Sequence, residues 1–386
     1  MRFGYFLAPY HPPGSNPTLA LERDLELGVL LDRLGFDEFW VGEHHSGGYE
    51  LIGSPEVFIA TLAERTRHIR LGTGVVSVPY HNPFHVASRA VLLDHLTRGR
   101  FMLGCGPGQL ASDMHMLGID TMQARPRMIE GMNVIRRLFA GEIVTQSSDW
   151  FTLNEARLQM LPYSPDGIEM AVTGSVTPTG AKIAGVTGIG LLSMAATTPQ
   201  GFEALRAHWQ VIEQSAADAG KAADRANWRI VGPMHLAETR EQAEADVAWG
   251  LPAFARYFHH VTPGGWLPGD TVEEMLRSNQ EKQVAVIGTP ADAIERIQQL
   301  IDQSGGFGTC VLLGHEWARP EATDKSLRLF AEEVMPHFTG ASAAPQASFE
   351  WVDGRAAEFA EANTRPFQAA RITPGAGNAS GKSTGS

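Results

Sequence analysis

Residues 69–104 read IRLGTGVVSVPYHNPFHVASRAVLLDHLTRGRFMLG. The apolar run Ile69–Val78 predicts a strand, Pro83–Leu96 predicts a helix, and Arg100–Gly104 predicts a second strand. A strand, a helix and another strand in this order form a crossover unit whose two strands lie parallel. The stretch therefore predicts an α/β fold built on a parallel sheet.

The same alternation extends to both sides of this stretch. Short apolar runs predict eight strands, near residues 4, 39, 73, 102, 171, 192, 231 and 311. The other helices are predicted over Leu19–Leu34, Ser54–Thr66, Pro126–Phe139, Thr177–Ala184, Pro199–Ala219, Arg240–Phe258, Pro290–Gln303 and Pro320–Met335. Eight such units close naturally into a (β/α)8, or TIM, barrel.

A doubly wound open sheet is the alternative α/β fold. Its usual signature is a glycine fingerprint in the turn after the first strand. The predicted first strand, Arg2–Ala8, is followed by PYHPPG at residues 9–14, which lacks that fingerprint. The barrel is therefore the preferred interpretation.

The sequence predicts two parts, a barrel domain over residues 1–338 and a C-terminal extension over residues 339–386. The long third strand and the irregular segment Trp266–Gln283 predict insertions around the C-terminal mouth of the barrel. Residues 341–373 keep apolar side chains that could pack along the barrel or a partner subunit, and we expect a homo-oligomer. The Gly/Ser/Ala-rich segment Pro374–Ser386 is expected to be disordered.

Composition and charge exclude several classes of protein. The net charge is −12 and no long basic run is present, which argues against a nucleic-acid or anionic-membrane surface. No apolar stretch reaches the ~18 residues of a membrane helix, and Met1–Phe6 does not resemble a signal peptide. The two cysteines, Cys105 and Cys310, do not make a disulfide framework. A cytoplasmic protein is expected.

Active groups of a barrel lie where its strands end at the carboxyl side. Glu43, His44 and His45 follow the second predicted strand. Successive strand residues point to opposite sides, so the two histidines are not expected to bind one metal ion. Either they are a hydrogen-bonded pair at a strand end, or one of them faces the mouth as a catalytic group.

Glycine-rich segments follow the third and fourth strands. Residues 72–79 read GTGVVSVP and residues 104–108 read GCGPG. Glycines at such places either let the backbone approach a flat ligand closely or simply form a barrel bulge. Cys105 is interpreted as a small core residue, since no base is evident that would activate its thiol.

The fifth strand ends in TGSVTPT at residues 173–179, directly before a helix. Hydroxyl groups at a helix N-terminus, together with free N–H groups and the helix dipole, favour a phosphate site over an ordinary cap. No metal site is predicted: Pro83 separates His81 from His85, and no carboxylate falls at the usual spacing. A Gly-x-Ser-x-Gly nucleophile elbow is also missing.

Several motifs resemble the bacterial luciferase-like flavin monooxygenases, above all the limonene and monoterpene-ketone monooxygenases. They are Phe3–Phe6, Gly35–Asp37, Glu43–His45, Leu71–Thr73, Leu93–Asp94, Gly99–Phe101, Val286–Pro290 and Val334–Pro336. Their order and spacing hold over about residues 1–338. The family fold is a (β/α)8 barrel, which agrees with the strand count.

The resemblance implies reduced FMN or FAD bound at the barrel mouth, where it reacts with O2. It implies that His44 assists proton transfer, with His45 and Asp113 near the site. It implies a non-prolyl cis peptide at Gly74–Val75 beneath the flavin ring. Further cofactor-binding positions implied by the resemblance are Gly106, Arg125, Ser175, Thr179 and Met194. Gly106 stands where luciferases have a reactive cysteine, and Gly174 and Pro107 replace an acidic and a basic residue of the family pattern.

The expected function is monooxygenation of a small apolar substrate, by epoxidation of limonene or by Baeyer–Villiger insertion into a cyclic terpene ketone. NAD(P)H would reduce the flavin directly or through a partner reductase. The alternatives are a deazaflavin-dependent dehydrogenase or reductase and a non-catalytic flavin-binding protein. Candidate pocket-lining residues are Met114, Met116, Met122, Phe151, Met194 and Trp266.

Overall fold

The computed structural model describes residues 1–8, 10–261 and 267–372. The expectations for Trp266 and for Pro374–Ser386 fall outside these residues. Two compact units are present, Met1–Phe338 and a second that begins at Thr339.

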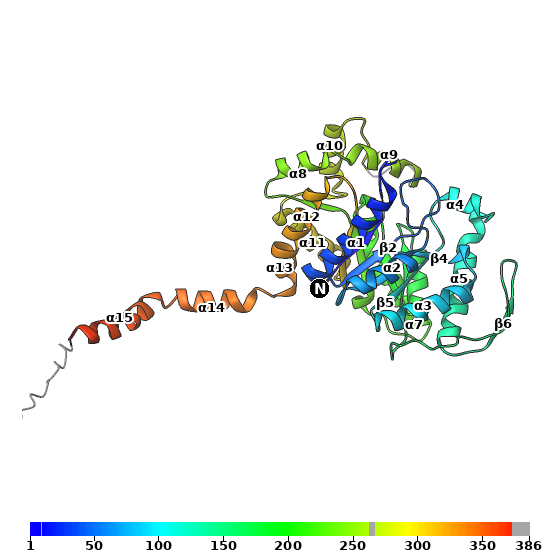
Figure 1. Cartoon of the computed structure of the whole chain (residues 1–386), viewed down its shortest axis with the longest axis horizontal. Coiled ribbons are helices and arrows are strands. Elements are labelled where there is room, and N and C mark those ends of the chain that lie inside the picture. Colours follow the sequence, from blue (N-terminus) through cyan, green and yellow to red (C-terminus); the bar gives the residue numbers. More distant parts are fainter. Residues whose placement is uncertain (9, 262–266, 373–386) are drawn as a thin grey trace, which may run out of the picture. The chain divides into compact units, whose positions relative to one another are not determined.

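The first unit is a closed barrel of eight parallel strands, so the predicted fold is confirmed (Figure 1). The strands are β1 (Arg2–Leu7), β2 (Glu38–Val41), β3 (Arg70–Thr73), β5 (Phe101–Gly106), β8 (Glu169–Gly174), β9 (Gly190–Ser193), β10 (Trp228–Gly232) and β13 (Thr309–Leu313). β1 pairs with β2 on one side and with β13 on the other, and β3 pairs with β5 to complete the ring.

Helices connect the strands as the alternation predicts. They are α1 (Pro17–Leu34), α2 (Pro55–Arg65), α3 (Pro83–Thr97), α5 (Thr121–Phe139), α6 (Thr179–Thr187), α7 (Pro199–Asp218), α11 (Pro290–Ser304) and α12 (Pro320–Leu329). α1 shows why the bounds fall where they do. The Asn16 side chain accepts hydrogen bonds from the first free N–H groups, and Gly35 ends the helix at φ 83°, where glycine carries no steric cost.

The predicted strand Ile69–Val78 is two strands. β3 ends at Thr73, and β4 (Val76–Ser77) pairs with the end of β5 instead of continuing beside β2. A short 3-10 helix, η1 (Val78–Tyr80), follows. The Gly74–Val75 peptide between β3 and β4 is cis, as predicted.

An insertion between β10 and β13 gathers at the top of the view in Figure 1. The predicted helix Arg240–Phe258 is wrong in one respect, because it is broken into α8 (Arg240–Val247) and α9 (Leu251–Val261). The break occurs where the N–H of Gly250 donates to the carbonyl of Trp317, 2.7 Å away. The segment expected to be irregular contains α10 (Val272–Lys282), which begins at a capping box formed by Thr271 and Glu274.

Smaller elements complete the chain. The insertion also holds a parallel pair, β11 (Met234–Leu236) and β12 (Val286–Gly288). β6 (Val144–Ser147) and β7 (Thr152–Ala156) form an antiparallel hairpin that projects from the body in Figure 1. The other elements are α4 (Ala111–Met116), η2 (Arg225–Asn227), a π-helical turn η3 (Phe330–Val334) and α13 (Met335–Thr339). The second unit contains α14 (Ala343–Asp353) and α15 (Ala356–Ile372).

The inside of the barrel is a packed core, not a pore. Apolar side chains from successive strands fill it: Phe6, Trp40, Met102, Ala171, Leu192, Val231, Val311 and Leu313. At the amino ends of the strands, the buried Arg229 binds both oxygens of Glu38 at 2.7 and 2.9 Å and also pairs with Glu169. Side chains therefore close the amino end of the barrel, and we expect the active site at the carboxyl ends of the strands.

Candidate active site

A cavity of about 560 Å³ lies at the carboxyl ends of the strands, in the size range of small-molecule sites. The loops after β1, β2, β3, β5, β8 and β9 contribute to its wall, together with α5, α9 and the end of α10. Polar, charged and apolar side chains all contribute to its lining. The cavity has room for a flat cofactor and a small substrate.

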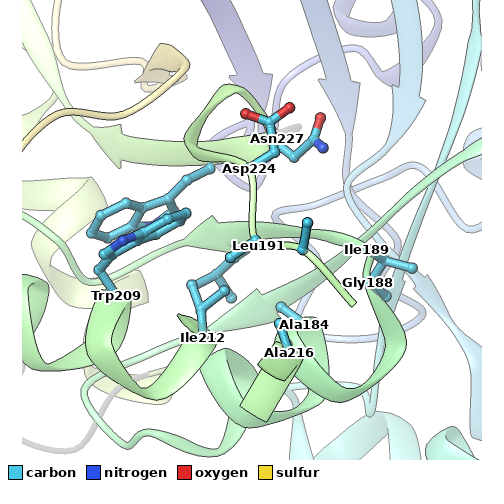
Figure 2. Close-up of a pocket in the computed structure, with 13 residues that line it drawn as sticks. Ala184, Gly188, Ile189, Leu191, Trp209, Ile212, Ala216, Asp224 and Asn227 are labelled. Carbon is cyan, nitrogen blue, oxygen red and sulfur yellow. The ribbon is translucent and has the colours of Figure 1, made fainter. Parts of the chain in front are cut away.

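Figure 2 shows a different, much smaller hollow, which is lined by residues of α6 and α7 and by the first residues of β9 and β10. Its volume is about 30 Å³, and Leu191, Trp209 and Ile212 are among its lining residues. A hollow of this size holds about one water molecule. We therefore place the candidate site in the large cavity at the barrel mouth.

His44 lines the cavity between two carboxylates. Its Nδ1 lies 3.2 Å from Asp113 Oδ2, and its Nε2 lies 3.4 Å from Glu50 Oε2. Asp113 comes from α4 and is fully buried, whereas Glu50 itself lines the cavity. Burial by itself lowers the pKa of His44, but the charges of Glu50 and Asp113 outweigh it and raise the pKa above its usual value. The site thus favours a protonated imidazole at the cavity wall.

Asp113 fixes the loop after β2 as well as the His44 ring. It accepts hydrogen bonds from the backbone N–H of His45 at 3.2 Å and from the Ser46 hydroxyl. These hydrogen bonds and the one with His44 outweigh burial and hold the pKa of Asp113 below its usual value. Asp113 therefore stays ionised behind the cavity, without lining it.

His45 points away from the cavity, as expected for a neighbour of His44. Its Nε2 lies 3.0 Å from Glu43 Oε1, which His81 Nε2 also approaches to 2.6 Å. Burial works against ionisation of Glu43, but the bonds with His45 and His81 outweigh it and lower the Glu43 pKa. Both interpretations of the histidine pair therefore apply. The two histidines are hydrogen-bonded at the strand end, and His44 alone of the two faces the mouth.

The glycine-rich turns form a flat part of the cavity wall. Gly74 and Val75 line it directly. Gly106 does not, because it lies under Val75; a Cβ at Gly106 would come within 2.4 Å of the Val75 side chain. Cys105 is buried, and burial raises the pKa of its thiol to about 12, so it has no nucleophilic character.

A polar end of the cavity is built at two helix N-termini. Gly174, Ser175 and Thr177 precede α6, and Thr198 and Gln200 begin α7. Arg125 from α5 and Lys282 from α10 line the same cavity and bring positive charge to it. Thr179 is the first residue of α6 but does not line the cavity. Free N–H groups, hydroxyls and cations together suit a phosphate group.

The apolar wall includes Phe6, Met194, Phe258, Val284 and Leu313. Of the methionines and aromatic residues expected there, only Met194 lines the cavity among those described. Met116 and Met122 are solvent-exposed because they lie on the outer side of α4 and α5. Met114 and Phe151 are buried elsewhere, Phe151 in the core between barrel and helices.

Sequence reasoning missed Glu50, Thr177, Gln200 and Lys282. Thr177 lies inside the TGSVTPT segment and could have been named with Ser175. Lys282 could not, because α10 was not predicted. The described residues contain no cluster of three or more His, Cys, Asp or Glu side chains able to hold a metal ion. Within the same residues, every helix is too short or too polar to cross a membrane.

The residues present fit a flavin. The backbone of Gly74, which carries no Cβ, suits close approach of a planar ring, the hydroxyl and cationic side chains suit its phosphate, and the apolar side chains of the lining suit an uncharged substrate.

Comparison with known proteins agrees with a flavin site. A family model described as luciferase-like monooxygenase matches residues 1–306. A limonene 1,2-monooxygenase of Rhodococcus erythropolis is 52% identical over 338 residues, 88% of this chain and 87% of the relative. A 4-hydroxyprotoasukamycin monooxygenase of Streptomyces nodosus subsp. asukaensis is 45% identical, with 91% and 95% of the two chains covered.

Among solved structures, the oxygenating constituent of 3,6-diketocamphane monooxygenase from Pseudomonas putida is similar in fold. It is described as a type II Baeyer–Villiger monooxygenase in complex with FMN. The TM-score is 0.72 at 23% identity, with 87% of this chain and 98% of that one covered. The predicted class of enzyme, a flavin-dependent monooxygenase, is confirmed, and the chain belongs to the luciferase-like monooxygenase family.

Proposed function

We propose that this enzyme transfers one oxygen atom from O2 to a monoterpene such as limonene, or to a cyclic terpene ketone. The observation that carries the proposal is the cavity at the barrel mouth, which His44 lines together with the apolar side chains of Phe6, Met194 and Leu313. The 52% identity with a limonene 1,2-monooxygenase supports a substrate of this size and polarity.

The chain's own residues have separate tasks in this proposal. Gly74 and Val75 support the flavin ring, and Ser175, Thr177 and Arg125 bind its phosphate. Thr179, the first residue of α6, lies next to this phosphate-binding segment in the chain. The reduced flavin supplies the electrons that activate O2. Phe6, Met194 and Leu313 keep water from the reacting atoms, which limits loss of activated oxygen as H2O2.

His44 is the acid–base group of the proposal. Its Nε2 is on the cavity side, where it can hold or give a proton at the reacting oxygen. Asp113 orients the ring through Nδ1. His45 does not line the cavity and reaches it only through Glu43, which does, so we assign His45 a positioning role.

The proposal extends to cofactor choice and partners. We favour FMN over FAD, since the solved relative of the same fold holds FMN. NAD(P)H would be consumed by a partner flavin reductase, because the strands described outside the barrel form only two pairs, β6–β7 and β11–β12, which are too small for a second nucleotide-binding sheet. A cytoplasmic homo-oligomer with a barrel domain over 1–338 and an extension over 339–386 completes the proposal.

A product assay tests the function. The protein would be mixed in air with limonene or with a cyclic terpene ketone, and with reduced FMN, reduced FAD or a reduced deazaflavin. Epoxide, lactone and H2O2 would be quantified with and without an added flavin reductase. We expect oxygenated product with reduced FMN. Product formation only with deazaflavin, or complete conversion of O2 into H2O2 with every substrate, would contradict the proposal.

A further inference from the structure

Glu50 connects the cavity histidine to the inserted helix α9. Its Oε2 lies 3.4 Å from His44 Nε2, and its Oε1 accepts a hydrogen bond from the Tyr257 hydroxyl. Glu50 and Tyr257 are both buried, and they lie 207 residues apart in the chain. A continuous series of polar groups therefore runs from Asp113 through His44 and Glu50 to Tyr257.

An aromatic cluster holds the Tyr257 end of this series. The Tyr257 ring lies 4.7 Å from the Tyr49 ring and 5.3 Å from the Tyr10 ring, measured between centroids. Tyr10 also forms an antiparallel bridge with Glu50. The loop after β1, the loop after β2 and helix α9 are thus packed together around the Glu50 carboxylate, which leaves it little freedom to turn away from His44.

The contacts of His44 favour one charge state. A neutral imidazole carries a proton on one nitrogen only, whereas the imidazolium carries one on each and is positively charged. The imidazolium therefore suits both the hydrogen bond of Nδ1 with Asp113 and the ion pair of Nε2 with Glu50. The other ionisable groups around His44 are Glu43 and His45 on its own loop. Arg125 and Lys282 line the same cavity from α5 and α10. Asp113 is buried behind the ring, so Glu50 is the carboxylate that meets His44 on the cavity side.

We propose that Glu50 is a positioning residue for His44, and that Tyr257 acts through Glu50 from the inserted helix. Glu50 holds the His44 ring with Nε2 at the cavity wall and keeps its proton there to a higher pH than Asp113 alone would. Tyr257 in turn fixes the Glu50 oxygen that faces His44. The effect on catalysis rests on the proposed function, but the effect on the His44 proton does not.

The first test needs no flavin. Protein labelled with ¹⁵N-histidine would be titrated by NMR, and the His44 signal would be identified by its loss in His44→Gln. In Glu50→Gln, which keeps the shape and removes the charge, we expect His44 to lose its proton at a lower pH than in the wild type. Tyr257→Phe should shift the titration in the same direction by a smaller amount. An unchanged His44 titration in Glu50→Gln overturns the proposal.

Tyr10→Phe is the matched control. It removes a buried hydroxyl that has no hydrogen-bond partner among the described residues, and it keeps a ring that packs on Tyr257. Its His44 titration should match that of the wild type. If Tyr10→Phe shifted the His44 titration as much as Tyr257→Phe does, the cause would be the packing of the aromatic rings and not the hydrogen bond from Tyr257 to Glu50. That result would also overturn the proposal. If Glu50→Gln does not fold, the His44 titrations of Tyr257→Phe and Tyr10→Phe still test the proposal. It is upheld if only Tyr257→Phe shifts the titration, and it is overturned if neither variant shifts it or if both shift it equally.

The second test is the pH profile of oxygen transfer. At mildly alkaline pH, Glu50→Gln should lose roughly tenfold or more in product with a matching rise in H2O2, the scale of a lost charged hydrogen bond. The loss should shrink as the pH is lowered, since His44 is then protonated in both proteins. The double variant with Tyr257→Phe should add little to Glu50→Gln. A wild type without product refutes the proposed function, whereas a normal wild type with an unshifted profile in Glu50→Gln refutes the role of Glu50.

Discussion

His44 has a carboxylate at each ring nitrogen and one edge at the cavity, and this arrangement gives a specific expectation for its removal. In His44→Ala, reduced flavin should still bind because the phosphate end is untouched. Product should fall by ~10²-fold or more, the usual scale for a positioned acid–base group, and the missing oxygen should appear as H2O2. Flavin binding, product and peroxide would be measured on the same preparation.

A purely structural role for His44 predicts something else. Loss of the hydrogen bond to Asp113 and of the ion pair with Glu50 would lower the melting temperature, while the molecules that remain folded would still couple O2 to product. A destabilised but well-coupled His44→Ala variant would therefore remove His44 from the mechanism. His44→Gln, which keeps one donor but cannot carry a charge, should resemble His44→Ala in product formation.

At the residue scale, sequence alone identifies groups that lie next to a strand end and misses those that come from far away. His44 could be singled out because it directly follows β2. Glu50 lies only six positions later, but its place beside His44 depends on Tyr257 from α9, 207 residues away. No local pattern encodes that pairing, so it emerges only from the folded chain.

At the scale of elements, the segment before α6 and the start of α5 both contribute polar side chains to the cavity. Arg125→Gln removes a cation from the proposed phosphate site and should weaken FMN binding by roughly tenfold or more. Riboflavin, which lacks the phosphate, should bind equally well to both proteins. Flavin fluorescence titrations would measure both affinities.

A matched variant controls for the loss of a positive charge from α5. Arg136→Gln changes the same charge at the other end of α5, outside the cavity lining, and should leave both affinities unchanged. Equal weakening of FMN and riboflavin in Arg125→Gln would mean that Arg125 supports the fold of the cavity and does not bind the phosphate.

The elements also show what a single sequence can predict. The eight barrel strands could be located because each is a short apolar run followed by a helical segment. α10 was missed although its capping box, Thr271 and Glu274, is visible in the sequence, because its surroundings suggested an irregular loop. The break between α8 and α9 could not be foreseen, since Gly250 bonds there to Trp317 from another part of the chain.

At the scale of the whole molecule, His11 joins three parts of the barrel rim. Its Nε2 lies 2.9 Å from Asp24 Oδ2 in α1, and its Nδ1 lies 2.7 Å from Glu316 Oε1 after β13. Burial alone would lower the pKa of His11, but its bonds to Asp24 and Glu316 outweigh it and raise the pKa to about 9. The ring is thus held as a cation between two carboxylates at neutral pH.

This charge makes stability depend on pH. The folded pKa of His11 is above the ~6.5 of an unfolded chain, so its contribution is complete below pH ~6.5 and is lost as the pH rises through about 9. That contribution is at most about 3 kcal/mol. We expect the melting temperature of the wild type to fall between pH 6.5 and 10 more than that of His11→Gln. Parallel curves for the two proteins would show that His11 carries no such charge.

The closure of the barrel through β1 and β13 also bears on how the chain is made. Arg2 pairs with Thr309, and the partner of the buried Glu38, Arg229, is synthesised 191 residues after it. At ordinary rates of translation, roughly 15 to 60 s pass between synthesis of the two edges. Throughout that time the ribosome carries a first strand with an unpaired edge, which is a template for aggregation. The nascent chain, more than the folded barrel, is therefore the form that exposes this strand edge.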